Sequence, residues 1–307
     1  MVLNRALAER RRALVSRSRI IRVIRNFFNE GGYLEVETPL RIPAPLPEAY
    51  IDAIPADGWY LHTSPELCMK RMLAAGFAQL FQICRCWRGG ERGSRHLPEF
   101  TMLEWYRTGT DYFGLMTECE LLVQQIVAGL GMMDSITYRG SNITVTGEWE
   151  RLSVREAYSR YGRMTIDEAL EQDLFDEIMT GDIEPLLGLE RPVFLYDYPA
   201  ERSALARLKA DDPAVAERFE LYIGGLEIAN AFSELTDAGE QRARFSRETA
   251  CRHASGKTVY PLPEKFLHEL PAIPSTAGIA LGVDRLVMVL LDAACIDDVV
   301  AFTPEEL

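Results

Sequence analysis

Charged side chains that suit a polyphosphate lie between two apolar-rich runs, at 81–87 and 100–106. The connection between these runs contains three glycines and four basic residues, Arg88, Arg92, Arg95 and His96. Guanidinium groups pair bidentately with phosphate oxygens, and glycine lets the backbone approach an anion closely. The pattern predicts two strands joined by a cationic loop that binds phosphate. A hairpin with a solvated basic tip is the alternative that charge count alone favours.

A second set of charged residues flanks the pair Gly224-Gly225, which is predicted to be the two-residue turn of a β-hairpin. In that register Glu220 lies opposite Ala229, and Glu220 and Glu227 share a face as diagonal neighbours about 7–8 Å apart. Two carboxylates placed in this way can share magnesium ions that are bound mainly through phosphate oxygens. A solvated strand face is the alternative interpretation.

Two predicted helix N-termini carry further charged residues. Ser64-Pro65-Glu66 begins a helix, in which Ser64 is a good cap and Glu66 favours the helix dipole. The stretch 278–291 is predicted to be a buried strand that runs into an apolar helix, with Arg285 in the first helical turn. An arginine at that position opposes the dipole and requires an anion, which is either the adjacent Asp284 or a phosphate.

The elements that must position these residues are readable from periodicity and from turn residues. We expect helices at 5–29 and 118–130, and a helical stretch at 152–189 without chemistry of its own. Strands are expected at Tyr33–Pro39, 59–63, 143–146 and 192–198, with a proline-broken loop at 43–55. Glu227, Asn230 and Glu234 fit one helical face, but as a strand they need a kink to point the same way.

Three of these stretches resemble the signature motifs of the class II aminoacyl-tRNA synthetases of the lysyl type, in the order of that family. R-H-L-P-E-F-T-M-L-E-W-Y at 95–106 resembles the second motif, and G-I-A-L-G-V-D-R-L-V-M at 278–288 resembles the third. The helix at 5–29 and the strand Tyr33–Pro39 resemble the first, which forms the dimer interface in the family. The resemblance therefore implies a homodimer.

Ser64, Trp105 and Ala280 are similar to a stand-alone subgroup of this family that lacks the anticodon-binding domain. Members of that subgroup attach (R)-β-lysine to a lysine of elongation factor P. The resemblance implies an α+β fold, in which residues 1–307 form a single class II catalytic domain with a mainly antiparallel sheet flanked by helices. It also implies a helical insertion at roughly 152–189 and no N-terminal OB-fold.

The implied reaction is an ATP-dependent carbon–nitrogen ligation through an aminoacyl-adenylate, with AMP and pyrophosphate as products. Carried over by motif, the catalytic residues are Arg88 and Arg285. The amino acid, (R)-β-lysine or lysine, is bound by Ser64, Pro65, Glu66, Glu104, Tyr106, Asn230, Glu234 and Ala280. ATP is bound by Arg88, Gly89, Gly90, Glu91, His96, Leu97, Phe100, Glu227, Ile228, Gly282 and Arg285. Mg²⁺ is bound by Glu220 and Glu227, while Phe100 stacks on adenine.

Two positions depart from the family pattern. The family usually has Arg-x-Glu where this chain has Arg88-Gly89-Gly90, and Asn where it has Leu97. The missing glutamate helps to read adenine, and Glu91, one position later, is a candidate substitute. A truncated lysyl-tRNA synthetase that charges tRNA, and a non-catalytic regulatory paralogue that binds an amino acid, remain as alternatives.

The composition bounds these interpretations. A chain of 307 residues with 48% hydrophobic and 26% charged residues is typical of a soluble globular protein, and no apolar run reaches the roughly 18 residues of a membrane span. We therefore expect a cytoplasmic protein without a membrane partner. The net charge of −13 disfavours tRNA, because nucleic-acid binding relies on neutralised phosphates. Six cysteines include no Cys-x-x-Cys pair, so Cys84 and Cys86 are interpreted as packing residues, with neither disulfide nor zinc expected.

Overall fold

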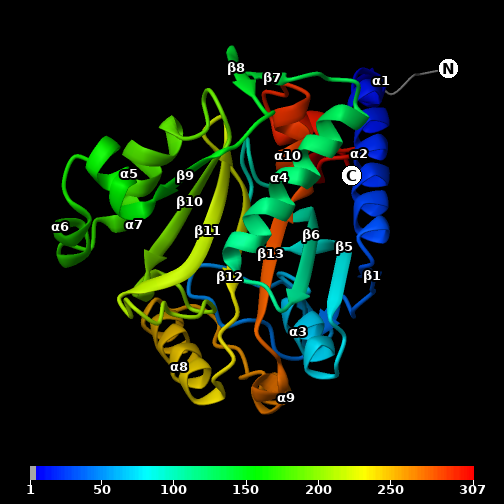
Figure 1. Ribbon diagram of the computed structural model, residues 1–307. Helices are drawn as coiled ribbons and strands as arrows, with labels where there is room; N and C mark the ends of the chain where they lie inside the picture. Colours follow the sequence, from blue (N-terminus) through cyan, green and yellow to red (C-terminus); the bar gives the residue numbers. More distant parts are fainter. Residues whose placement is uncertain (1–4) are drawn as a thin grey trace.

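The computed structural model describes residues 5–307 and is built around one large sheet (Figure 1). Neighbouring strands are antiparallel, except for the two edge pairs β1–β5 and β9–β10, which are parallel. The predicted α+β architecture, a mainly antiparallel sheet flanked by helices, is confirmed. In spatial order the strands are β1 (Leu34–Glu35), β5 (Gln79–Trp87), β6 (Glu99–Thr108), β13 (Thr276–Gly282), β12 (Leu226–Ser233), β11 (Val215–Ile223), β10 (Val193–Pro199) and β9 (Glu150–Ser153).

Two small sheets lie at the periphery of the large one. The first contains the short strands β2 (Arg41–Ile42), β4 (Trp59–Leu61) and β3 (Pro55–Ala56), so it includes the strand that was expected at 59–63. The second is the hairpin of β7 (Ser135–Tyr138) with β8 (Ser141–Thr144).

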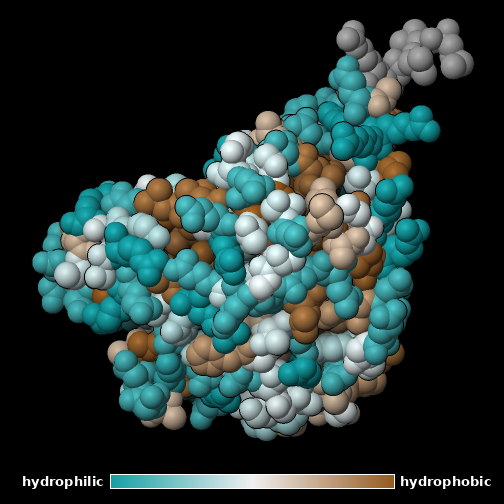
Figure 2. All heavy atoms as spheres, turned by 45° about the horizontal axis from the view of Figure 1, so that its top comes forward, coloured by the Kyte–Doolittle hydropathy of each residue, from teal (hydrophilic) through white to brown (hydrophobic). Residues whose placement is uncertain are grey.

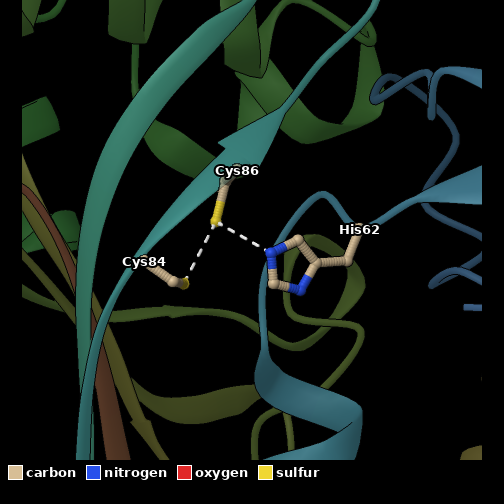
Figure 3. Close-up of side chains that lie close together, drawn as sticks. All are labelled: His62, Cys84 and Cys86. Atoms are coloured by element: carbon tan, nitrogen blue, oxygen red, sulfur yellow. Dashed lines mark hydrogen bonds between the residues drawn. The ribbon is translucent and has the colours of Figure 1, made fainter. Parts of the chain in front are cut away.

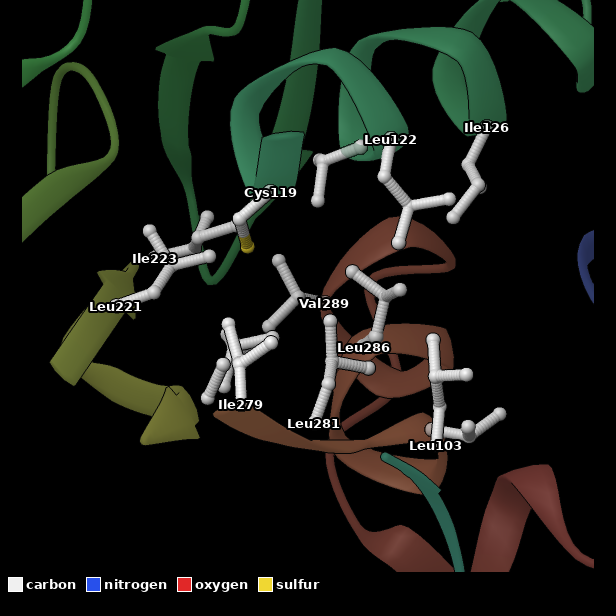
Figure 4. Close-up of a cluster of buried hydrophobic side chains, with 14 of the residues drawn as sticks. Leu103, Cys119, Leu122, Ile126, Leu221, Ile223, Ile279, Leu281, Leu286 and Val289 are labelled. Carbon is white, nitrogen blue, oxygen red and sulfur yellow. The ribbon is translucent and has the colours of Figure 1, made fainter. Parts of the chain in front are cut away.

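Helices cover one face of the large sheet, as Figure 1 shows. They are α2 (Arg11–Glu30), α4 (Tyr112–Gly129) and α10 (Val283–Leu290), while the short α1 (Arg5–Glu9) packs on α2. Figure 4 shows how side chains of α4 and α10 meet side chains of the sheet in the largest hydrophobic core, where Leu122 and Leu286 lie among Leu103, Ile279 and Leu281. Because side chains alternate along a strand, this packing leaves the opposite side chains of the same strands for another purpose.

A second hydrophobic core belongs to the lobe between β9 and β10. This lobe contains α5 (Val154–Tyr161), α6 (Ile166–Glu171) and α7 (Phe175–Ile178), followed by a π-helical turn and a 3₁₀ turn. Ser153 with Glu156, and Thr165 with Glu168, form capping boxes that fix the starts of α5 and α6. The helices thus fall within the predicted helical stretch.

A third core lies on the face of the sheet that the first core leaves free. There α3 (Glu66–Ala74), α8 (Ala238–Ala254) and α9 (Glu264–Glu269) pack near Leu80, Tyr106 and Phe232 of the sheet. These three sheet residues have even numbers, whereas Phe81, Leu103 and Ile279 of the first core have odd numbers. The open part of this even-numbered face is where a site can form.

Two predicted boundaries were wrong. The helix expected at 118–130 begins at Tyr112, because the Asp111 side chain caps it by accepting a hydrogen bond from the Gly114 N–H at 3.0 Å. The strand expected at Tyr33–Pro39 is only two residues long, Leu34–Glu35, and pairs at the sheet edge with β5.

No helix within residues 5–307 is both long enough and apolar enough to cross a membrane. On the face drawn in Figure 2, hydrophilic residues dominate the lobe on the left, and apolar residues are scattered in small areas nearer the centre.

Candidate active site

Residues predicted to bind the amino acid lie side by side on the open face of the sheet. In the strand register, Glu104 of β6 lies opposite Ala280 of β13, and Ala280 lies opposite Asn230 of β12. Two residues further along the same strands, Tyr106 and Phe232 lie on either side of Gly278. The three strands therefore form a continuous floor on which side chains distant in sequence are neighbours.

A β-bulge in the hairpin of β11 and β12 decides that Asn230 shares a face with Glu220 and Glu227. Tyr222 lies opposite Glu227 as predicted, but the register then shifts, and Glu220 lies opposite Asn230. The predicted pairing of Glu220 with Ala229 was wrong, because Ile228 is an extra residue in β12. The turn itself was predicted correctly, with φ of 62° at Gly224 and 71° at Gly225.

The bulge also settles how Glu227 and Asn230 point the same way. A regular strand would turn residues three apart to opposite faces, whereas the extra residue restores them to one face. Both side chains line a single cavity of 320 Å³ above the sheet. The segment is thus a kinked strand and not a helix.

Most of the predicted nucleotide-binding residues line that same cavity. Its walls include Arg88, Glu91, His96, Leu97, Phe100, Glu227, Ile228, Gly282 and Arg285, together with Asn230 and Ala280. Gly89 and Gly90 do not line it. The Gly89 N–H donates to the Asp52 carbonyl at 2.6 Å, and Gly90 has a φ of 78°, so these glycines shape the turn of the loop.

Arg285 connects three parts of the cavity wall. Its Nη1 donates to Glu227 Oε2 at 2.9 Å, its Nη2 donates to His96 Nε2, and its Nε lies 3.4 Å from the Arg95 carbonyl oxygen. Burial, and then the nearby Arg285 charge, lower the pKa of His96. The neutral imidazole can therefore accept this hydrogen bond.

Asp284 is not the anion that balances Arg285. Its Oδ1 accepts from Arg17 of α2, and its Oδ2 accepts from the backbone N–H of Thr101 at 2.7 Å. The interpretation in which Asp284 neutralises Arg285 was therefore wrong. Since Glu227 is a partner at the cavity surface, the guanidinium of Arg285 remains directed into the cavity.

Arg88 lies over the ring of Phe100, with its Cζ 5.1 Å from the ring centroid. Its Nη1 is 4.0 Å from Glu91 Oε1, and its buried Nε has no hydrogen-bond partner among residues 5–307. A buried donor without a partner is costly unless a ligand satisfies it. Arg88 is therefore positioned to bind an anion beside an aromatic ring.

Buried carboxylates surround Lys70 next to the cavity, in which they are not lining residues. The Nζ of Lys70 lies 2.5 Å from Glu66 Oε1 and 2.5 Å from Glu234 Oε2, and also 5.0 Å from the ring centroid of Phe232. Burial alone would lower the pKa of Lys70, but the charges of Glu234 and Glu66 raise it above its ordinary value. Burial raises the pKa of Glu234 to about 8, against the opposing effect of Lys70.

The third carboxylate, Glu104, lies opposite Ala280 of the cavity lining and accepts a hydrogen bond from the Tyr106 hydroxyl. Its buried Oε2, like Oε1 of Glu234, has no hydrogen-bond partner in the described part of the chain. Burial, and then the charge of Glu66, raise the pKa of Glu104 well above its ordinary range. An ammonium group can donate hydrogen bonds to both of these unpartnered oxygens.

Gly278 makes this crowded arrangement possible. A Cβ at Gly278 would lie 2.2 Å from the Tyr106 ring and 2.6 Å from Glu234 Oε1. Any side chain at this position would displace both groups. The amino-acid end thus depends on a residue that leaves space and makes no contact through a side chain.

Glu220 lies in a dense hydrogen-bond network. The hydroxyls of Tyr198 and Tyr222 each donate to its Oε2 at 2.6 Å, and Arg218 donates to its Oε1 at 2.5 Å. Glu227 has fewer partners and a more exposed side chain, at 37%. Both carboxylates are hard oxygen donors beside the cationic wall, so the pair fits Mg²⁺ shared with phosphate oxygens, with Glu227 the more available ligand.

Sequence reasoning missed Arg218, Lys70 and Glu48. Arg218 lies two residues before Glu220 on the same strand, so strand alternation already placed it on the same face. Lys70 lies one helical turn after Glu66, a spacing typical of ion pairs. For Glu48, in the proline-broken loop, we find no such signal; burial raises its pKa to about 7.

A second cavity, of 480 Å³, adjoins the first and shares Glu48, Ile51, Arg218, Glu220 and Asn230 with it. It extends between α7 and α8, and several carboxylates line it: Glu48, Asp176, Glu184, Glu201, Glu220 and Glu248. The two cavities form one continuous site with a cationic wall at one end and an acidic opening at the other.

The site thus combines a cationic cavity wall, a neighbouring set of buried carboxylates and a mainly antiparallel sheet beneath both. The family model for tRNA synthetases class II (D, K and N) matches residues 2–306. The chain belongs to this family.

Within the family, the similarity to one kind of relative extends over almost the whole chain. The protein named elongation factor P–(R)-beta-lysine ligase from Pectobacterium atrosepticum is 40% identical over 310 residues, which cover 95% of this chain and 95% of the relative. Proteins of the same name from Proteus mirabilis and Salmonella gallinarum are 39% and 40% identical, and in both cases 94% of each chain is covered.

Proposed function

We propose that this protein is an ATP-dependent ligase that activates (R)-β-lysine, or lysine, as an aminoacyl-adenylate and transfers it to a lysine side chain of elongation factor P. The observation that carries this proposal is the set of buried carboxylates around Lys70, which adjoins Ala280 and Asn230 in the lining of a cavity with a cationic wall. One substrate with ammonium groups and one with phosphates fit the two ends. The names of the relatives support both the amino acid and the acceptor.

The cationic wall would hold ATP. Arg88 would bind the α-phosphate, where its unpartnered Nε becomes satisfied, and Phe100 would stack on adenine. His96 and Arg285 would bind the outer phosphates, for which Arg285 exchanges Glu227 for phosphate oxygens. Mg²⁺ on Glu227 and Glu220 would neutralise the pyrophosphate charge.

The acidic floor favours a diamine over other amino acids. Glu66, Glu104 and Glu234 carry three negative charges when ionised, and Lys70 supplies one positive charge, so two negative charges remain. A substrate with two ammonium groups balances them. Ammonium groups also satisfy the unpartnered oxygens of Glu104 and Glu234. Ala280 lies between Glu104 and Asn230 on the floor, and its methyl group leaves less space for the substrate than a glycine at this position would.

The chemical steps need no protein nucleophile. The substrate carboxylate attacks the α-phosphorus and displaces pyrophosphate, which gives the mixed anhydride with AMP. The ε-amine of the acceptor lysine then attacks the acyl carbon, loses a proton and displaces AMP. The contribution of the protein is to align these groups and to balance their charge.

We infer that the acceptor lysine enters through the adjoining acidic cavity between α7 and α8. Its carboxylates complement a cationic side chain, and it meets the first cavity at Arg218 and Asn230. We also propose that residues 1–307 act as one catalytic domain, and that the protein works as a cytoplasmic homodimer. Exposed Val15, Leu34 and Leu40, on or near α2 and β1, support the dimer.

ATP–pyrophosphate exchange tests the activation step. Exchange is measured with (R)-β-lysine, α-lysine and a panel of monoamine acids, each as the single substrate. We expect exchange with a diamine and none with the monoamine acids. Mass spectrometry of elongation factor P incubated with enzyme, ATP and (R)-β-lysine is expected to show one added β-lysyl group. A folded protein that exchanges with no amino acid, or that charges tRNA in place of the protein acceptor, contradicts the proposal.

A further inference from the structure

His62, Cys84 and Cys86 form a cluster that the ligation reaction does not use. Cys84 and Cys86 extend from the same face of β5, and His62, just after β4, extends toward them (Figure 3). The two sulfurs are 3.9 Å apart, and Cys86 Sγ is 3.9 Å from His62 Nε2. Within residues 5–307 this is the one group of three or more metal-ligand side chains whose ligand atoms all lie within 4.8 Å of one another.

The spacing of these atoms matches one face of a tetrahedral metal site. Bonds of about 2.3 Å to sulfur and about 2.0 Å to nitrogen give edges of about 3.8 Å between two sulfurs and about 3.5 Å between sulfur and nitrogen. The two separations of 3.9 Å exceed these edges by about 0.1 and 0.4 Å, and the third, between Cys84 Sγ and the His62 ring nitrogen, is within 4.8 Å. Side-chain rotations would bring all three atoms onto one ion.

A disulfide is not a competing use for the two cysteines. Residues two apart on a strand are about 6.6 Å apart along the backbone, and their side chains extend in parallel from the same face. A disulfide requires Cβ atoms only about 3.5–4.5 Å apart. Cys84 and Cys86 are fixed in β5 by their pairing with Met102 and Phe100. Closing the bond would break that pairing, so both sulfurs stay available as thiols or thiolates.

The chemistry of the cluster favours a thiophilic cation. Two of the three ligand atoms are sulfurs, which Zn²⁺ and softer cations bind well. Met102 Sδ, 3.9 Å from Cys86 Sγ, adds another soft atom beside the site. Cys84 is partly exposed, so an ion has access, while Cys86 and His62 are buried.

We propose that His62, Cys84 and Cys86 bind a thiophilic divalent cation such as Zn²⁺, with the fourth position open to water. This replaces the expectation that the two cysteines only fill space. Metal binding would replace one existing contact, the hydrogen bond between His62 Nε2 and the Arg85 carbonyl oxygen, which are 2.7 Å apart. With metal on Nε2, the imidazole carries its proton on Nδ1.

A bound cation would lie beside the amino-acid end of the active site. Cys84 and Cys86 share the face of β5 that carries Gln82, and Gln82 lies opposite Glu104. A cation placed here competes with the substrate ammonium for the negative charge of Glu104. Occupancy of the metal site should therefore slow adenylate formation. This effect on the reaction rests on the proposed ligase function, whereas metal binding itself does not.

Cobalt spectroscopy tests the site without any reference to activity. The reduced protein is titrated with Co²⁺, and we expect thiolate-to-cobalt charge-transfer absorption that saturates at one ion per chain and disappears when Zn²⁺ is added. Cys84→Ser and Cys86→Ser should each weaken Co²⁺ binding at least tenfold. Cys251→Ser, which changes an exposed cysteine outside the cluster, is the matched control and should bind as the unaltered protein does.

Alkylation of the unaltered protein gives a second measurement that does not depend on whether the variants fold. Zn²⁺ should protect Cys84 from iodoacetamide, as read by peptide mass spectrometry, and leave the reaction of Cys251 unchanged. No charge-transfer band, a band that survives in the double variant of Cys84 and Cys86, or equal protection of Cys251 would each overturn the proposal.

The exchange assay separates the site from its consequence. At buffered free Zn²⁺, exchange by the unaltered protein should fall at least several-fold, while exchange by Cys84→Ser should not change. If cobalt binds but exchange is insensitive to Zn²⁺, the metal site stands and its inhibitory role is refuted. If no amino acid supports exchange, the ligase proposal fails and the cobalt result is unaffected.

Discussion

The two ends of the active site handle charge differently. At the nucleotide end, Arg285 and Arg88 are 20% and 26% exposed, and each has an acidic partner at the cavity surface. At the amino-acid end, Lys70 and Glu234 are almost fully buried. Partly exposed charges exchange partners at lower cost, because water and salt screen them, whereas buried charges must be balanced one for one.

This difference indicates that affinity and selectivity arise separately. With the ligands proposed above, the nucleotide end would attract a highly charged ligand and tolerate changes in the position of its phosphates. At the amino-acid end, binding depends on the number of charges that the ligand carries, because an uncompensated ion in a buried site is strongly destabilising. Substitutions at the acidic floor should therefore act on one substrate alone, whereas substitutions at the cationic wall should act on the transition state.

The largest effect is expected from Glu234→Gln. Removing this buried partner of an ammonium group should weaken diamine binding by on the order of 3–5 kcal/mol, since a charge is left uncompensated. ATP binding should change little. Isothermal titration with each ligand alone checks this result, with Glu264→Gln on the surface as the control. Equal losses for the two ligands would show that the ends are not separate.

Arg285→Ala comes next. Loss of a positioned cation at developing phosphate charge costs about 10²–10³ in rate, or roughly 2.7–4 kcal/mol. The fold should survive, because Asp284 keeps its bonds to Arg17 and Thr101. Pyrophosphate exchange and thermal melting are measured together, with Arg242→Ala as the control. Unfolding of the variant would instead assign Arg285 a structural role.

Lys70→Met should lower the stability of the free protein by about 2–3 kcal/mol. The full cost of a broken buried pair, about 3–5 kcal/mol, is reduced because Glu234 can take up a proton. Burial already raises the pKa of Glu234 to about 8, and without Lys70 it rises further. A carboxyl whose pKa is raised by folding destabilises the fold progressively as pH rises above its unfolded value of about 4.3.

The deficit of Lys70→Met relative to the unaltered protein should therefore grow as pH rises above about 8, where Glu234 ionises in the unaltered protein and stays protonated in the variant. Added lysine should restore part of this deficit by supplying an ammonium group. Chemical denaturation across this range measures both effects. Lys209→Met, which breaks a more exposed ion pair with Asp197, should show neither. A deficit that is independent of pH would show that Lys70 acts through packing.

The smallest effect is expected at Glu91, whose carboxylate lines the cavity beside Arg88. If it reads the adenine amino group, Glu91→Ala should reduce the preference for ATP over GTP in the exchange assay by about 1–2 kcal/mol, roughly 5- to 30-fold. Glu99→Ala is the control. Gly90→Glu is a less direct test, because a φ of 78° at Gly90 strains any side chain. Unchanged selectivity in Glu91→Ala would contradict the role proposed for Glu91.

Much of the sheet could be predicted from the sequence. The Gly224-Gly225 turn and the strand-to-helix transition before Arg285 follow from local rules, since turn residues and apolar runs lie next to what they shape. The bulge at Ile228 was missed, although a signal was present. Ile228 and Ala229 are consecutive apolar residues, which interrupt the alternation of a regular strand.

Partners distant in sequence could not be predicted in this way. Asp284 was considered as a partner of its neighbour Arg285, but it binds Arg17, 267 residues away. Likewise, no local pattern shows that Lys70 lies between Glu66 and Glu234, because the last of these comes from another element. Such pairs are set by tertiary packing, which periodicity does not encode.

The bulge at Ile228 also constrains how the gene for this protein can change. Deletion of the codon for Ile228 would remove the bulge and restore a regular hairpin, with Asn230 still opposite Glu220 and on the face of Glu227. A one-codon change elsewhere in β12 that no bulge absorbs would instead turn every later side chain of the strand to the other face. Descendants of this sequence can therefore change the length of β12 only together with the number of its bulges.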